Sequence, residues 1–217
     1  MNIIARKTGI ISSIGILLFT LIFVILVFVF PAGEYETADQ FISRYSPAML
    51  FPVIPSLLIV LANIIFFVSL FYYADERVRP LALAGLIFGT AYAVCAGTNY
   101  FIQLTVVPQN IRLEQVSSVA SFSMHVRGSF TYALDNLGYI FLSFSFLLFS
   151  GIFDLKGLQG YIKTAFIVYG ITGLLGATGY MAGNSFLESF VFISAFPYLI
   201  AIVLMLIQYF RLEDKTV

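Results

Sequence analysis

The feature that most constrains this chain is a recurrence of long, nearly uncharged apolar runs. A helix needs about 20 mainly apolar residues to cross the hydrocarbon core of a bilayer, and runs of this length recur along the sequence. Polar or turn-forming segments such as PAGEYETADQ, ADERVRP and DLKGLQG separate them. We therefore expect an all-α membrane bundle of six transmembrane helices, at roughly 10–30, 50–73, 81–107, 129–153, 161–182 and 186–210.

The composition agrees with a membrane protein. Hydrophobic residues make up 60% of the 217 residues and charged residues 10%, whereas about 25% of the residues of soluble domains are charged. The apolar runs leave no room for a separate soluble domain, so we expect 1–217 to form a single transmembrane domain surrounded by lipid. The net charge of zero predicts no nucleic-acid partner. A helix-packing partner or an oligomer remains open.

The first apolar run, Ile10 to Phe30, is interpreted as a membrane span rather than as a secretory signal, whose apolar core is only about 7–15 residues long. Lysine and arginine are enriched in cytoplasmic loops, and this bias predicts the orientation. One set of termini and connections contains Arg6, Lys7, Arg77, Arg79, Lys156, Lys163, Arg211 and Lys215. The other contains Arg44, Arg112 and Arg127. The asymmetry predicts cytoplasmic N and C termini in a multi-pass protein of the cell membrane.

Two outer connections, 31–49 and 108–128, are longer than a turn requires. In the second, apolar residues recur at helical spacing at Leu113, Val116, Ala120 and Met124. This pattern predicts a short amphipathic helix on the outer membrane surface, with an ordinary loop as the alternative. If both connections fold over the bundle, they cap a cavity that opens outward.

Two spans carry polar residues at helical spacing, which predicts one polar face on each helix. In the span at 129–153 these residues are Tyr132, Asp135, Asn136, Tyr139 and Ser143. In the span at 81–107 they are Tyr92, Asn99 and Gln103, in line with Cys95 and Ala96. Polar groups are costly in lipid, so we expect the two faces to meet inside the bundle.

Three interpretations of Asp135 are open. If its helix begins near Leu137, Asp135 is an N-cap at the outer interface. It is otherwise a buried structural hydrogen-bond node, or a ligand or proton site. Asn99 and Gln103 lie well inside an apolar run, where amide side chains usually join helices. The predicted ligand-binding set is Asn99, Gln103, Tyr132, Asp135, Asn136 and Tyr139.

Other residues have simpler interpretations. The sequence SFLE matches a capping box, with Ser185 as the cap and Glu188 bonding back to its amide. His125 is expected at the surface. A face of small residues in the fifth span predicts close helix packing. Its glycines are Gly170, Gly173, Gly176, Gly179 and Gly183.

The sequence contains no recognisable catalytic motif of the common hydrolase, nucleotide-binding or zinc-protease kinds. One histidine and one cysteine are too few for the usual zinc sites, so we expect no metal and no cofactor. The chain is accordingly expected not to be an enzyme, although Asp135 keeps that question open.

The stretches NYFIQLTVVP (99–108) and ALDNLGYIFL (133–142) resemble those of multi-pass membrane proteins of bacteria that have no assigned activity. The resemblance covers two helices, and its motifs are not specific. It implies no catalytic residues, and it favours one shared site for Asn99, Gln103, Asp135, Asn136 and Tyr139.

Three functions follow from these patterns. The first is a bundle that binds, senses or passes a small amphipathic molecule through a polar site between the third and fourth spans. The second is an accessory subunit that packs against a larger membrane complex. The third is an intramembrane enzyme that acts on a lipid-like substrate, with Asp135 as its proton donor or acceptor.

Overall fold

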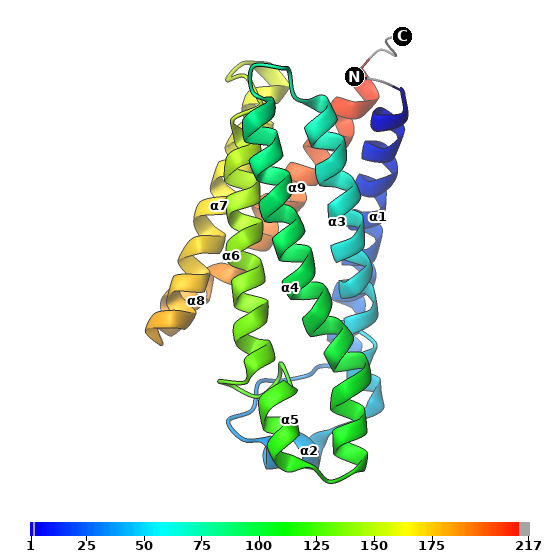
Figure 1. Cartoon of the computed structure of the whole chain (residues 1–217), viewed down its shortest axis with the longest axis vertical. Coiled ribbons are helices and arrows are strands. Elements are labelled where there is room, and N and C mark those ends of the chain that lie inside the picture. Colours follow the sequence, from blue (N-terminus) through cyan, green and yellow to red (C-terminus); the bar gives the residue numbers. More distant parts are fainter. Residues whose placement is uncertain (2, 213–217) are drawn as a thin grey trace.

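The computed structural model describes residue 1 and residues 3–212, and the regular secondary structure of this part of the chain is all helical, without strands (Figure 1). Within it, six helical segments are long and apolar enough to cross a membrane. They are α1 (Ile3–Val29), η1 with α3 (Pro47–Leu50 and Val53–Tyr73), α4 (Arg79–Arg112), α6 (Phe130–Ser150), α7 (Gly157–Ala182), and α8 with α9 (Ser185–Glu188 and Phe190–Arg211). The predicted all-α class is confirmed, each predicted span falls on one of these six helical segments, and the chain has the architecture of a multi-pass membrane protein.

The six long helices form a closed ring. Each packs against the next along the chain, in the order α1, α3, α4, α6, α7 and α9, and α9 returns to pack against α1. Figure 1 shows α9 crossing behind the bundle toward the N-terminal end of α1. The ring encloses the buried side chains, while large apolar residues such as Phe28 and Phe192 point outward.

Phenylalanine side chains fill the centre of the six-helix bundle. Phe67 of α3 and Phe149 of α6 stack with their centroids 5.6 Å apart, and both are fully buried. Two glycines of α4 make room for them: a Cβ at Gly85 would lie 2.9 Å from the ring of Phe149, and one at Gly89 would overlap the ring of Phe67. Lipid tails are as apolar as these side chains, so close packing of this kind holds membrane helices together.

The predicted glycine face of α7 packs closely. A Cβ at Gly173 would overlap Ser143 of α6, and one at Gly179 would overlap the backbone at Leu187 and Glu188, where α8 lies. Gly183 ends the helix in the left-handed conformation, with φ of 63°. The close helix contact expected from the glycine spacing is therefore confirmed inside the chain.

The two long connections meet at one end of the bundle, where Figure 1 places α2 (Ala38–Arg44) and α5 (Val116–Phe122) side by side. Their apolar residues form a second small core with the end of α4, which includes Phe41, Val107, Val119 and Val126. A short parallel bridge pairs Tyr35 with Val126. We call α2, α5 and the segments beside them the outer cap.

Two details of the outer cap differ from the sequence-based interpretation. A helix forms in the second connection, but its buried position is Val119, whereas Leu113 and Val116 are exposed. His125 is not a surface residue: its ring stacks on Phe41 at 5.6 Å and its side chain bonds to the backbone of Gly33. Burial lowers the pKa of His125 to about 4, so this side chain is neutral at pH 7.

The other end of the bundle carries both ends of the described chain. Met1 and Leu212 line the same cavity there, opposite α2 and α5 (Figure 1). That this end faces the cytoplasm stays a prediction, and Lys215, which contributed to it, lies outside the described residues.

Candidate functional site

The seam between α4 and α6 brings the two polar faces together. Asn99 of α4 is fully buried, and its Nδ2 donates a hydrogen bond to Oδ1 of Asp135 on α6, at 3.0 Å. Gly138 of α6 faces Cys95 of α4 at this seam, where a Cβ at Gly138 would lie 3.4 Å from Cys95 Cβ, an ordinary packing contact. The expected meeting of the two polar faces is confirmed.

Asp135 is not a helix cap. Helix α6 begins at Phe130, and its N-cap is Ser129, whose hydroxyl accepts a hydrogen bond from the amide of Tyr132. Asp135 therefore lies in the second turn of the helix, where its side chain has no orphan amide to satisfy. The N-cap interpretation is wrong because the helix starts earlier than Leu137.

Gln103 connects this seam to the outer cap. Its Nε2 donates to Oδ1 of Asn99 at 3.0 Å and to the carbonyl of Phe122 at 2.9 Å, and its Oε1 accepts from the amide of Met124 at 3.0 Å. Gln103 thereby fixes both the orientation of the Asn99 amide and the path of the chain after α5. Neither Asn99 nor Gln103 lines the cavities described below.

Asp135 is only partly covered by protein, because it lies between two cavities. The outer cavity, of about 270 Å³, is bounded by α6, by the start of α9 and by the segment after α1. The inner cavity, of about 240 Å³, reaches α1, α3 and α4. Asp135, Tyr139 and Met124 line both. Oδ2 of Asp135 has no hydrogen-bond partner in the described part of the chain.

The inner cavity is mainly aromatic. Its walls are Phe23, Ser56, Ile59, Tyr92, Tyr100, Met124, Asp135 and Tyr139. The hydroxyls of Tyr100 and Tyr139 are 3.4 Å apart, and the rings of Tyr92 and Tyr139 have centroids 6.3 Å apart. Tyr92 is 3% exposed, and its hydroxyl makes no hydrogen bond to any described residue.

A cluster of charged and polar groups borders the outer cavity. Arg127 Nη2 lies 2.9 Å from Oε2 of Glu188, and its Nε lies 3.8 Å from Oε2 of Glu34. The hydroxyl of Tyr132 donates to Glu34 and Glu188, at 3.1 and 3.0 Å. Glu188, and more weakly Glu34, raises the pKa of Arg127. We call these four residues the outer cluster.

The outer cluster overturns the capping-box interpretation of Glu188. The N-cap of α8 is Asn184, whose Oδ1 accepts from the amides of Phe186 and Leu187. The carboxylate of Glu188 is thus available to Arg127 and Tyr132. No local pattern pairs residues this far apart in the sequence, so sequence reasoning missed Glu34, Arg127 and Glu188.

The six predicted site residues therefore have different positions. Tyr132, Asp135, Asn136 and Tyr139 line the outer cavity, although the amide of Asn136 bonds to the carbonyl of Tyr132 on its own helix, at 2.9 Å. Asn99 donates a hydrogen bond to Asp135 and accepts one from Gln103, and neither Asn99 nor Gln103 lines the inner or the outer cavity. The cavity walls on α1 and α3, such as Phe23 and Ile59, were not predicted, because apolar residues in a span carry no distinguishing signal.

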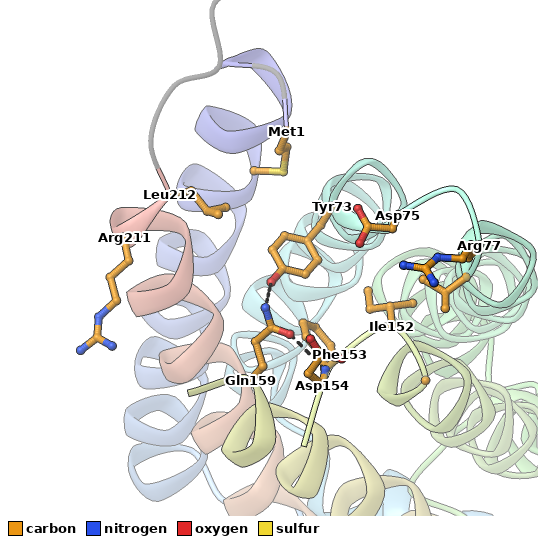
Figure 2. Close-up of a pocket in the computed structure, with 12 residues that line it drawn as sticks. Met1, Tyr73, Asp75, Arg77, Ile152, Phe153, Asp154, Gln159, Arg211 and Leu212 are labelled. Atoms are coloured by element: carbon orange, nitrogen blue, oxygen red, sulfur yellow. Dashed lines mark hydrogen bonds between the residues drawn. The ribbon is translucent and has the colours of Figure 1, made fainter. Parts of the chain in front are cut away.

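A larger hollow of about 770 Å³ opens at the end of the bundle that carries Met1 and Leu212 (Figure 2). Figure 2 shows Gln159 between two partners: its Nε2 donates to the hydroxyl of Tyr73, and its Oε1 accepts from the amide of Asp154. Gln159 thus connects Tyr73 of α3 with the segment before α7, whereas the carboxylates of Asp75 and Asp154 in the same wall are exposed. These two carboxylates lie at the surface of the protein, whereas Asp135 is partly covered between the helices.

Among the described residues, no group of three or more histidine, cysteine or acidic side chains is placed to hold a metal ion. Comparison of the chain with models of known families, with curated proteins and with solved structures gives no match. The resemblance to bacterial multi-pass membrane proteins therefore stays a prediction, and the function has to be argued from the cavities themselves.

Proposed function

We propose that this protein binds a small amphipathic molecule in the two cavities beside Asp135. The proposal rests on the carboxylate of Asp135, of which only one oxygen has a hydrogen-bond partner in the described part of the chain. Asn99 donates to that oxygen, the other oxygen has no partner among the described residues, and Asp135 lines both cavities. A polar group inside a membrane bundle is costly unless it has a partner, and a ligand is a natural partner for it.

The shape of the cavities supports an amphipathic ligand. Carboxylate and hydroxyl groups line the outer cavity, whereas Phe23, Ile59 and Met124 supply much of the inner wall. A molecule with a polar head and a short apolar chain matches both regions. Each cavity is at or below the lower end of the usual range for ligand sites, about 300–1,000 Å³, which favours a small ligand.

The absence of tryptophan from the sequence gives a clean test. A Phe23→Trp variant carries one tryptophan in the wall of the inner cavity. A Phe28→Trp variant is the matched control, because Phe28 is on the same helix, is 83% exposed and faces away from the bundle. Both are titrated in detergent micelles with 1-hexanol, hexanoate and hexylammonium.

We expect at least one probe to change the emission of the Phe23→Trp protein saturably, at concentrations that leave the Phe28→Trp protein unchanged. Equal, non-saturating responses from both proteins would mean that the probes only dissolve in the micelle. The cavities would then have no binding role, and the accessory-subunit function would be the better account of the fold.

A further inference from the structure

We infer that the polar head recognised beside Asp135 is an alkylammonium group. This inference rests on the proposed function and narrows it to one chemical class. It is drawn from three properties of the cavities: the aromatic wall, the unpaired oxygen atoms and the balance of charge.

The aromatic wall has the composition of a cation site. Four rings, those of Phe23, Tyr92, Tyr100 and Tyr139, line the inner cavity together with the carboxylate of Asp135. The face of an aromatic ring carries partial negative charge and attracts an ammonium group within about 6 Å of its centroid. Rings on α1, α4 and α6 surround the same space, so one cation can contact several of them.

The unpaired oxygens supply hydrogen-bond acceptors for the same head. Asp135 and Tyr92 both line the inner cavity, and neither Oδ2 of Asp135 nor the hydroxyl of Tyr92 has a partner among the described residues. Tyr92 is 3% exposed and lines the inner cavity, so a further partner for its hydroxyl has to come from that cavity. An alkylammonium has three N–H groups and could donate one to each oxygen, whereas a carboxylate head has no hydrogen to donate.

The charges around the cavities exclude an anionic head. The described residues that line the outer cavity include the carboxylates of Glu34, Asp135 and Glu188. The guanidinium of Arg127 lies beside them, but Glu188 and Glu34 already bind it. His125, which also lines this cavity, is neutral. A negative head would meet carboxylates without a free cation to offset them.

The test uses the Phe23→Trp reporter and the same three probes, which share one chain and differ in the charge of the head. We expect hexylammonium to bind at least tenfold more tightly than 1-hexanol, and hexanoate to bind most weakly. In the reporter background, Asp135→Asn keeps an oxygen acceptor for Asn99 but removes the charge. It should weaken hexylammonium binding about ten- to a hundredfold and leave 1-hexanol binding nearly unchanged.

Two further variants complete the test. Asp39→Asn removes an exposed carboxylate of α2 at the same end of the protein, so it should leave the preference for hexylammonium intact. Tyr92→Phe keeps the aromatic ring and removes its acceptor, so it should lower the affinity for hexylammonium severalfold even if Asp135→Asn does not fold.

The outcomes separate this inference from the proposed function. Saturable binding of 1-hexanol or hexanoate as tight as that of hexylammonium would overturn the ammonium assignment and leave the binding function standing. A preference for hexylammonium that survives both Asp135→Asn and Tyr92→Phe would also overturn it. Failure of all three probes to bind would remove both.

Discussion

Gln103 offers the sharpest test of how the α4–α6 seam is held. Replacement by leucine keeps most of the side-chain volume but removes the hydrogen bonds to Asn99, to the Phe122 carbonyl and to the Met124 amide. Hydrogen bonds between membrane helices average about 0.6 kcal/mol and reach about 2 kcal/mol. The buried amide of Met124 is also left without a partner, at a cost of about 1–3 kcal/mol.

Gln103→Leu should therefore lower the free energy of unfolding by about 2–4 kcal/mol. The Phe122 carbonyl keeps a bond from Thr131 Oγ1 at 2.8 Å, which limits the loss. The measurement is an unfolding titration with sodium dodecyl sulfate in mixed micelles, followed by circular dichroism. Thr105→Val on the same helix is the matched control, because the Thr105 hydroxyl bonds to the Phe101 carbonyl of its own helix.

A second measurement distinguishes a local effect from a global one. If Gln103 fixes the outer cap, trypsin should cleave after Arg112 or Arg127 faster in Gln103→Leu than in the Thr105→Val protein. The reasoning is refuted if Gln103→Leu loses no more stability than Thr105→Val and the cleavage rates are also equal. Gln103 would then be a tolerated polar residue rather than a connection between α4 and the cap.

Three further predictions follow from other contacts. Gly179→Leu should cost more stability in detergent than Leu174→Ala, because its side chain would overlap the backbone of α8; an equal or smaller loss in a thermal unfolding assay would contradict the close contact. His125 has a pKa of about 4 in the folded protein and 6.5 when exposed, so the unfolded chain binds more protons between these two pH values. The free energy of unfolding should therefore fall as the pH is lowered from 6.5 to 4, by up to about 3 kcal/mol. His125→Phe should flatten that part of the pH dependence of the unfolding free energy relative to the wild type, and parallel curves would rule the effect out. In a Cys95→Ala background, a membrane-impermeant thiol reagent applied to intact cells should label Asp39→Cys and not Lys156→Cys; the reverse pattern would invert the predicted orientation.

The positions of the membrane helices could be predicted from the sequence because the signal is local. Each membrane helix has to pair its own backbone hydrogen-bonding groups and has to present an apolar surface to the lipid, and both requirements are visible in its local sequence. The contact between Asn99 and Asp135 was also predictable, since each lies on a polar stripe and polar stripes avoid lipid. The sequence could not decide whether Asp135 was a cap, because that depended on whether α6 began at Phe130 or near Leu137.

The rest of the candidate site depends on which of the six long helices pack against one another. Phe23 and Tyr92 line one cavity only because α1 and α4 both pack on α3, and no periodicity within a single span encodes that arrangement. The bond between Arg127 and Glu188 depends on where α8 turns back after Gly183. The local sequence SFLE predicted a capping box at Glu188, but the Glu188 carboxylate instead forms an ion pair with Arg127.

The distribution of burial along α1 has a consequence for how a ligand arrives. Its buried residues all lie between Ala5 and Ile16, while the half that carries Phe23 is nowhere fully covered. If a bilayer surrounds the bundle, this half of α1 lies between the inner cavity and the lipid, and its low burial predicts that it is the wall least costly to displace. The ligand proposed above, if dissolved in the membrane, would then have a lateral route to Asp135. Its occupancy would follow its mole fraction in the lipid rather than its concentration in water, so two ligands of equal site affinity would be ranked by how strongly they partition into the membrane.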